Sequence, residues 1–153
     1  MPDMTADEAR RRFAAARVAR LATIDAAGRP HLVPVVFATH GPDGIVTAVD
    51  HKPKTTTRLK RLRNIAAHPA VCLLADAYDE DWDRLWWVRA DGLARVLPPG
   101  TADPAARDVR AAALALLGDK YPQYRRHPPA GPVITVTVGH WTGWRARAVT
   151  DSR

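Results

Sequence analysis

The sequence of 153 residues is short of cysteine and serine, and each shortage excludes a class of protein. The one cysteine, Cys72, cannot form an internal disulfide bond, which excludes a small secreted protein held together by disulfides. The one serine, Ser152, lies outside any Gly-x-Ser-x-Gly motif, so the sequence lacks the nucleophile of that hydrolase class. No apolar run approaches the roughly 18 to 20 residues that cross a bilayer. Residues 1–12 are polar and lack the apolar stretch of a signal peptide, so we expect a cytoplasmic protein without membrane attachment.

Motifs for nucleotide and metal sites are missing as well. The chain has neither a P-loop nor a Gly-x-Gly-x-x-Gly turn. Its histidines show neither His-x-x-x-His nor cysteine-paired spacing, which predicts no metal site: His31, His40, His51, His68, His127 and His140. Cys72 stands in an apolar run and is interpreted as a buried structural thiol. The sequence therefore identifies no catalytic residue.

Positive charge is concentrated in one segment. The chain has 23 lysines and arginines against 16 acidic residues, a surplus of seven. Residues 51–67 contain no acidic residue and six basic ones: Lys52, Lys54, Arg58, Lys60, Arg61 and Arg63. Two interpretations remain open. The segment is either a site for a phosphate or carboxylate anion, or the solvated face of a helix whose Leu59, Leu62 and Ile65 face the core.

Periodicity and turn signals predict about six strands and three helices. Thr5 followed by Glu8 is a capping box, which predicts a helix that begins there. A second helix covers the basic segment, and a third begins at Asp103-Pro104 and ends at Gly118. Residues 121–132 are interpreted as an irregular connection. The predicted strands are Arg17–Ile24, Pro30–Thr39, Ile45–Val49, Val71–Ala75, Trp86–Val96 and Val133–Trp141.

The arrangement of these strands predicts the fold class. Tight turns join the first three strands, which are expected to form an antiparallel meander. Pro34 inside the second strand predicts an edge strand, a bulge, or a place where the backbone is left free for a ligand. Strands with few helical excursions favour a mainly β antiparallel barrel with flanking helices over a parallel α/β sheet. Because the chain has no internal repeat and no long linker, we expect residues 1–153 to form a single domain.

The five tryptophans fall into two groups, one at 82–87 and one at 141–144. In the second group, Trp141 and Trp144 flank Gly143, which lets the backbone pass close to a ligand. The indoles are either core and dimer-interface residues or the walls of a pocket for a flat ring. Aromatic walls beside a basic anion site suit a phosphorylated, planar cofactor.

A family resemblance rests on these stretches in this order: Arg17–Asp25, Gly28–His31, Pro34–Phe37, Asp50–Lys54, Leu59–Leu62, Asn64–Ile65, Pro69, Asp81–Trp82, Leu85–Arg89, Gly92–Ala94 and Trp141–Trp144. In this order they resemble the pyridoxamine-5′-phosphate-oxidase-like split-barrel superfamily. The resemblance is greatest to its actinobacterial branch, which uses the deazaflavin coenzyme F420. An arginine-rich, lysine-poor composition agrees with that branch.

The resemblance implies a six-stranded antiparallel split β-barrel and a homodimer that binds its cofactor in clefts at the dimer interface. The cofactor ring is expected against four residues of the second strand: Pro34, Val35, Val36 and Phe37. The phosphate-bearing tail is expected at five basic residues: Lys52, Lys54, Arg58, Lys60 and Arg61. The aromatic residues expected from the partner subunit are Trp82, Trp141 and Trp144.

Two departures from the family pattern bear on the activity. The R-x-x-L-L-K flavin motif of true pyridoxamine-phosphate oxidases is absent after the second strand, and Arg145–Arg153 lacks their substrate-phosphate signature. Pyridoxamine phosphate oxidation is therefore not expected. The tail of the deazaflavin carries more negative charge than flavin mononucleotide (FMN), which suits six unopposed basic residues.

The resemblance thus implies a coenzyme F420-dependent oxidoreductase that passes a hydride to a small unsaturated substrate. One alternative is an FMN-binding oxidoreductase or flavin reductase of the same fold. Another is a non-catalytic carrier of deazaflavin or haem, with His51 or His140 as the haem ligand. A nucleic-acid binder is the third, although the chain has no recognised nucleic-acid module and its basic residues are confined to one segment.

Overall fold

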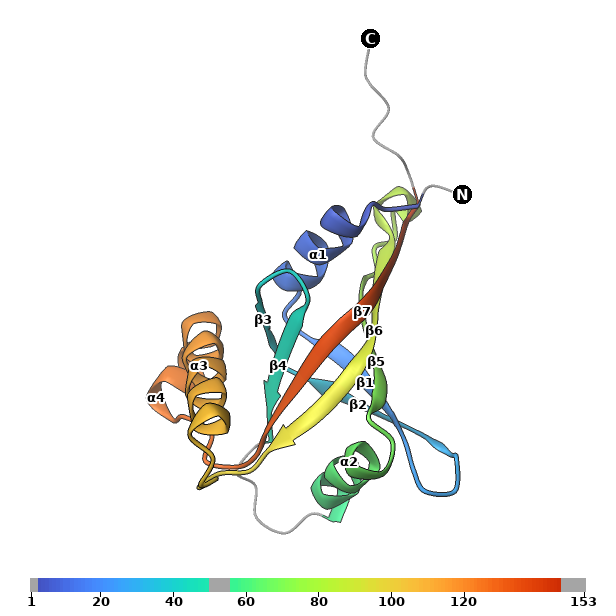
Figure 1. The fold of residues 1–153 in the computed structure, drawn as a ribbon. Helices are drawn as coiled ribbons and strands as arrows, with labels where there is room; N and C mark the ends of the chain where they lie inside the picture. Colours follow the sequence, from blue (N-terminus) through green and yellow to red (C-terminus); the bar gives the residue numbers. More distant parts are fainter. Residues whose placement is uncertain (1–2, 50–55, 147–153) are drawn as a thin grey trace.

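The computed structural model describes residues 3–49 and 56–146, and for residues 56–59 it describes the backbone alone. At its centre lies one antiparallel sheet with the strand order β2-β1-β5-β6-β7-β4-β3 (Figure 1). The strands are β1 (Ala19–Ile24), β2 (Pro30–Val35), β3 (Ala38–His40), β4 (Gly44–Ala48), β5 (Ala70–Ala77), β6 (Trp86–Leu97) and β7 (Val133–Arg145).

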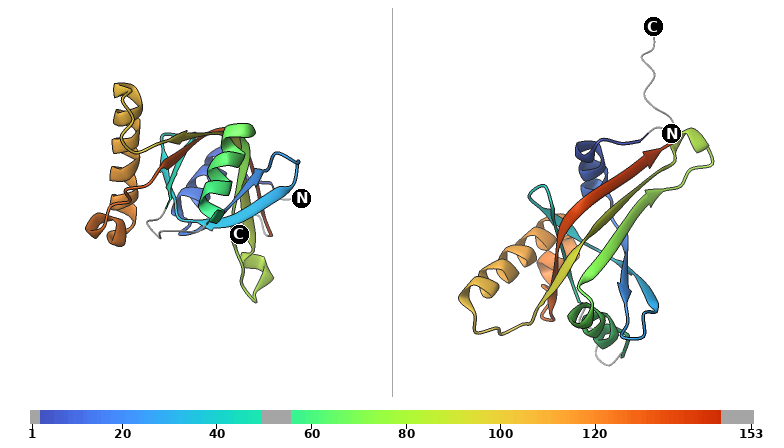
Figure 2. Two further views of the ribbon diagram at one scale, coloured as in Figure 1. Left: turned by 90° about the horizontal axis from the view of Figure 1, so that it is seen from below. Right: turned by 45° about the vertical axis from the view of Figure 1, so that its right-hand side comes forward.

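Helices lie at both ends of the sheet and along one side. They are α1 (Ala6–Ala15), α2 (Thr56–Ala67), α3 (Pro104–Lys120), α4 (Pro122–Arg126) and the 3-10 helix η1 (Trp82–Arg84). In Figures 1 and 2, α2 lies at one end of the long strands, whereas α1 and η1 lie at the other. Helices α3 and α4 stand beside β3 and β4. None of the helices in the described residues is long and apolar enough to cross a membrane.

The expected second strand, Pro30–Thr39, is in fact two strands, and this changes the expected barrel. The strand ends at Val35, and β3 begins at Ala38 on the opposite edge of the sheet. The described residues therefore form a sheet of seven strands that is not closed, rather than a six-stranded barrel, and the expected three-strand meander is wrong. The reason is that side chains bond the backbone at the break: the Thr47 hydroxyl donates to the Val36 carbonyl, 2.7 Å away. Because β2 is an edge strand, the prediction from Pro34 is confirmed.

Local signals at helix starts predicted the structure well. The Thr5 hydroxyl accepts a hydrogen bond from the Glu8 N–H, 3.2 Å away, and α1 begins at the next residue after Thr5. The Asp103 carboxylate caps α3 in the same way by accepting from the Ala105 N–H.

The predicted end of the third helix is wrong, and the predicted irregular connection 121–132 holds only for residues 127–132. Helix α3 continues past Gly118 to Lys120, and α4 follows at once. Contacts with residues distant in the sequence hold the end of α3 beyond Gly118. The Lys120 ammonium donates to the carbonyls of Ala14 and Ala16, at 3.1 and 2.7 Å. These tertiary bonds override the helix-stop signal of the glycine.

The core has two parts. The larger one lies inside the curve of the sheet and contains Phe13, Leu21, Phe37 and Leu73, all fully buried. The second lies between the sheet and α3, around residues such as Leu117. Helix α2 closes the lower end of the larger core with Ile65, which is 3% exposed, and so positions the basic segment at that end.

Candidate functional site

The strand segment expected to face a cofactor ring presents only part of itself to solvent. Pro34 is exposed and Val36 half-buried, whereas Val35 and Phe37 are buried. The Phe37 ring packs on Phe13 with 4.6 Å between ring centroids, so its side chain belongs to the core. A ligand would meet this segment through Pro34, Val36 and the backbone.

A cavity of about 300 Å³ opens beside Val36. Its other walls come from α4 and the residue before it: Tyr121, Pro122, Gln123 and Tyr124. The two tyrosine rings meet edge to face, 6.1 Å apart. The volume is at the lower end for small-molecule pockets, and the aromatic walls suit a flat ring.

The basic segment lies at the α2 end of the sheet. Lys60 is partly exposed and stands 3.9 Å from the Asp25 carboxylate in the β1–β2 turn. Arg61 is half-buried. The side chain of Arg58 and the whole of Lys52 and Lys54 lie outside the described part of the chain. The helix predicted for this segment is confirmed, and its role in binding an anion stays a prediction.

Asp25 organises the turn beside α2. Its carboxylate accepts from the backbone N–H groups of Arg29 and Ala27, at 2.8 and 2.9 Å. The hydrogen bond from Arg29 is the main reason that the pKa of Asp25 lies below its usual value, and the nearby Lys60 ammonium lowers the pKa further.

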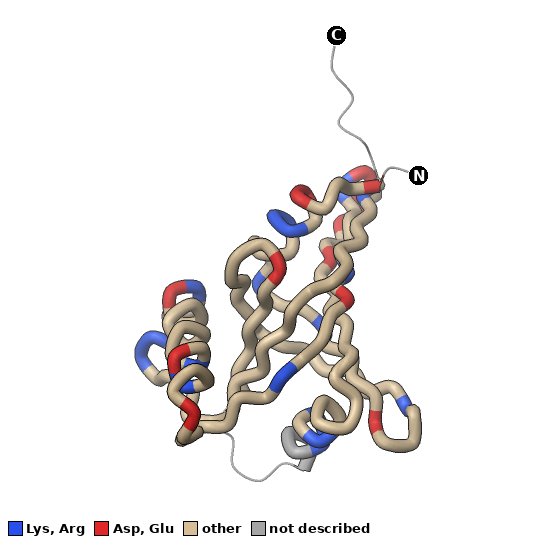
Figure 3. The backbone as a smooth tube through the Cα atoms, in the orientation of Figure 1, with Lys and Arg blue, Asp and Glu red and all other residues tan. Residues whose placement is uncertain are grey.

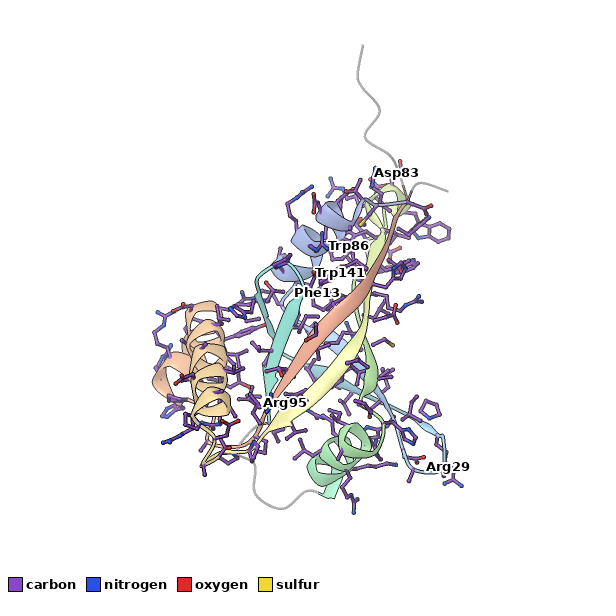
Figure 4. The ribbon with its side chains drawn as sticks, viewed as in Figure 1. Phe13, Arg29, Asp83, Trp86, Arg95 and Trp141 are labelled. Carbon is purple, nitrogen blue, oxygen red and sulfur yellow. The ribbon has the colours of Figure 1, made fainter. Side chains whose placement is uncertain are left out.

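The fold adds two basic residues that the sequence did not indicate. Arg29 lies at the tip of the β1–β2 hairpin and Arg95 near the lower end of β6, both exposed and both in the half of the molecule that contains α2 (Figures 3 and 4). They are distant in sequence from residues 51–67, so a charge count along the chain could not find them. Helix α2 thus has positive neighbours from two other elements.

The three expected aromatic residues have three different surroundings. Trp82 is 68% exposed on η1. Trp141 is half-buried on the inner face of β7, where its indole N–H donates to the Asp43 carboxylate, 3.0 Å away, and its ring packs on Phe13. This hydrogen bond, followed by that from Arg10, lowers the pKa of Asp43. Trp141 therefore has a structural role within one chain.

Trp144 differs, because its indole nitrogen is buried but has no hydrogen-bond partner. The Thr142 hydroxyl two residues earlier is also buried without a partner. Trp141, Gly143 and Arg145 face inward toward α1 and the first residues, so alternation places Thr142 and Trp144 on the outer face of β7. Nearly all buried polar groups find a partner, so these two atoms, which the chain itself already covers, are exceptions.

The outer face of the sheet has a cavity of about 480 Å³ and several exposed apolar side chains. Its walls are Arg20, Ala22, Leu32, Cys72, Leu74, Asp76, Trp87 and Arg89. Leu32 is 65% exposed and Leu74 37%. Cys72, expected to be buried, is only half-buried in this cavity, and burial still raises the pKa of its thiol. Ion pairs Arg20–Asp76 and Arg89–Asp91 give the face both charge signs.

One chain does not bring the basic segment and the expected tryptophans together. Pro69, just after α2, accepts a hydrogen bond from the Ala94 N–H, so α2 lies near that part of β6. Trp144 pairs with Trp87 near the opposite end of the strand. Seven residues at roughly 3.3 Å each separate the two points by about 23 Å. In Figure 4, Arg29 and Asp83, a neighbour of Trp82, lie at opposite ends of the molecule.

Comparison with known proteins identifies the family. The family model described as pyridoxamine 5′-phosphate oxidase matches residues 5–145, so the chain belongs to this family. No protein of curated function matches the sequence. Among the described residues, no group of three histidine, cysteine or acidic side chains is placed to hold a metal ion.

Solved structures have the same fold at low sequence identity. A FAD-binding protein from Mesorhizobium loti is 19% identical, with a TM-score of 0.68, 92% of this chain covered and 94% of the other. A FAD-binding protein from Mycobacterium smegmatis is 20% identical, with a TM-score of 0.61 and coverage of 95% and 99%. A haem storage protein from Vibrio cholerae is 14% identical, with a TM-score of 0.64 and coverage of 91% and 90%.

Proposed function

We propose that this protein is an oxidoreductase that binds a phosphorylated flat-ring cofactor between two copies of the chain, and that this cofactor is coenzyme F420. The observation that carries the proposal is the indole N–H of Trp144, which the chain buries without a partner and which a change of side-chain rotamer would turn toward a ligand on the outer face. It supports a site that one chain leaves incomplete. FAD-binding proteins share the fold, which is compatible with a flavin-like ligand.

A two-fold axis perpendicular to the long strands would join the two halves of the site. If two outer faces pack around such an axis, the Trp144 end of one copy lies beside the α2 end of the other. Because the outer face carries both positive and negative side chains, the faces of two copies can attract each other, for example through Arg20 of one copy and Asp76 of the other. The homodimer is therefore part of the proposal.

The residues of the chain fit the parts of the cofactor. In the proposed complex, Lys52, Lys54, Arg58, Lys60 and Arg61 bind the anionic tail, aided by Arg29. Pro34 and the backbone of Val35, Val36 and Phe37 support the ring, and Trp144 of the second copy donates its N–H to a ring acceptor. Trp82, exposed on η1 of the second copy, covers the site beside Trp144.

The bound cofactor supplies the hydride, and the protein orients ring and substrate and excludes water from them. The cavity beside Val36 would hold the small unsaturated substrate between Tyr121 and Tyr124. Several glutamates on the deazaflavin tail favour coenzyme F420 over FMN, because the α2 end gathers basic residues from three elements.

Titration of the purified protein with coenzyme F420, FMN and haem, followed by tryptophan quenching, tests the proposal. We expect micromolar or tighter binding of coenzyme F420 and weaker binding of FMN. Reduced coenzyme F420 should then be oxidised by an electron-poor unsaturated compound only when the protein is present. Tight binding of FMN, with no binding of coenzyme F420, would show that FMN is the cofactor. Binding of haem alone would show that the protein is a carrier and not an enzyme.

Trp144→Phe isolates the carrying observation, because it removes the indole N–H and keeps an aromatic ring. We expect cofactor affinity to fall by about tenfold, the equivalent of one hydrogen bond. Trp86→Phe is the matched control, since its ring lies on the inner side of the neighbouring strand β6, at the same end of the β6–β7 pair, against Arg12. Equal affinities in Trp144→Phe and the wild type would contradict the role of this N–H.

A further inference from the structure

The chain crosses from one edge of the sheet to the other at Val36 and Phe37. These two residues lie between β2 and β3, outside both strands. Val36 forms a wall of the cavity described above. The backbone conformation at this crossing therefore sets the shape of that cavity.

The Tyr121 hydroxyl bonds the backbone of the crossing on two sides. It accepts a hydrogen bond from the Phe37 N–H, 3.2 Å away. Its own proton is directed to the Phe37 carbonyl at 2.9 Å or to the Arg17 carbonyl at 3.0 Å. One side chain thus satisfies groups that a neighbouring strand would satisfy inside a sheet.

Lys120, the preceding residue, holds the same region from the side of α1. Its ammonium donates to the carbonyls of Ala14 and Ala16 and lies 3.9 Å from the centre of the Phe37 ring. Two hydrogen bonds and a cation–π contact compensate the partial burial of this charge. The end of α3 is thereby fixed against both the crossing and the end of α1.

We propose that Tyr121 and Lys120 are positioning residues, which hold Val36 and Phe37 in the conformation that forms the ligand cavity. The role rests on the proposed function, because it assigns the cavity to the ligand of that site. Tyr121 acts twice: its hydroxyl fixes Phe37 and its ring faces the cavity. Loss of the hydroxyl therefore changes ligand affinity through the backbone, with the aromatic wall kept in place.

Tyr121→Phe tests the proposal with Tyr78→Phe as the control, since Tyr78 is 70% exposed and directly follows the end of β5. Hydrogen exchange of the Phe37 amide in the ligand-free protein reports directly on the backbone. We expect this amide to exchange about tenfold faster in Tyr121→Phe, the loss of one hydrogen bond, while core amides such as Leu73 stay unchanged. The dissociation constant for coenzyme F420 or FMN should rise by about the same factor. Tyr78→Phe should alter neither quantity.

The outcomes separate this proposal from the proposed function. If the wild type binds a cofactor and Tyr121→Phe binds it equally well, the positioning role is wrong and the function stands. If the wild type binds neither cofactor, the proposed function is wrong, and the ligand role of Tyr121 falls with it. Should Tyr121→Phe fail to fold, Lys120→Met removes the other positioning residue, and unchanged cofactor affinity together with unchanged exchange of the Phe37 amide in that variant overturns the proposal.

Discussion

Asn64 is a polar residue on the core side of α2, 4% exposed, and its side chain bonds a buried residue of β1. Its amide nitrogen donates to the hydroxyl of Thr23, 3.1 Å away and 1% exposed. Because both groups are cut off from water, each depends on the other for a hydrogen bond. The pair also fixes the rotation of α2 on β1, and so the direction in which its basic side chains point.

Asn64→Ala should destabilise the protein by about 1–3 kcal/mol, because it leaves the Thr23 hydroxyl buried without its donor. Chemical unfolding monitored by tryptophan fluorescence measures the change. Arg63→Ala is the control, since Arg63 is exposed at the preceding position of the same helix. A loss below about 0.5 kcal/mol in Asn64→Ala, the range of ordinary surface substitutions, would show that the pair contributes nothing.

Lys120 makes stability depend on pH in a defined direction. Partial burial, and then the charge of Arg17, lower the pKa of its ammonium to about 8 from its ordinary value near 10.5. Between the two pKa values, the unfolded chain holds a proton that the folded protein has released. The free energy of unfolding therefore increases as the pH rises through this range. We expect the melting temperature of the wild type, relative to that of Lys120→Met, to rise from about pH 8 to about pH 10.

NMR of the lysine side-chain signals checks the same group without unfolding. The signal absent from Lys120→Met should titrate near pH 8 in the wild type. A midpoint above pH 10 for that signal, or a constant difference in melting temperature across the range, would contradict the expectation.

Among the elements, those specified by local chemistry could be predicted and those specified by distant contacts could not. The start of α1 follows from Thr5 and Glu8, three residues apart, and the structure has it there. The break of the predicted strand Pro30–Thr39 depends on Tyr121, 84 residues away from Phe37 in the chain. Nothing in residues 30–39 indicates such a partner.

The same distinction explains what was predicted of the candidate site. The basic helix and the tryptophan-rich strands are local patterns, and the structure contains both. Their separation at opposite ends of the sheet depends on strand order, which periodicity does not determine. Arg29 and Arg95 join the basic end for the same reason, through pairing rather than sequence proximity.

Strands β6 and β7 form the longest pair in the sheet, and a bulge between Asp91 and Gly92 interrupts their register. A Cβ atom on Gly92 would overlap the carbonyl oxygen of Thr137, which belongs to the backbone and cannot rotate away. We expect Gly92→Ala to destabilise the protein by about 1–3 kcal/mol, as overpacking does elsewhere. Gly139→Ala is the matched control on the partner strand, where the nearest atom is 3.9 Å from the added Cβ. Equal unfolding midpoints for the two variants would contradict this account of the bulge.

At the scale of the whole molecule, the outer face of the sheet, with its exposed leucines, decides whether the proposed site exists. Leu74 lies on this face, 37% exposed beside Trp87 in the larger cavity. In a dimer built on this face, an arginine at position 74 would bury an unpaired charge, at a cost of several kcal/mol. We therefore expect Leu74→Arg to be monomeric in sedimentation experiments at a protein concentration where the wild type is a dimer.

Val109→Arg provides the matched control, with the same apolar-to-arginine change on α3, where Val109 is 46% exposed. It should remain dimeric and bind the cofactor with the affinity of the wild type. Leu74→Arg should lose cofactor affinity together with the dimer, because the Trp144 of one copy would no longer reach the basic end of the other. A folded Leu74→Arg monomer with unchanged affinity would mean that one chain holds the complete site. The cofactor would then not bridge the α2 end of one copy and the Trp144 end of another.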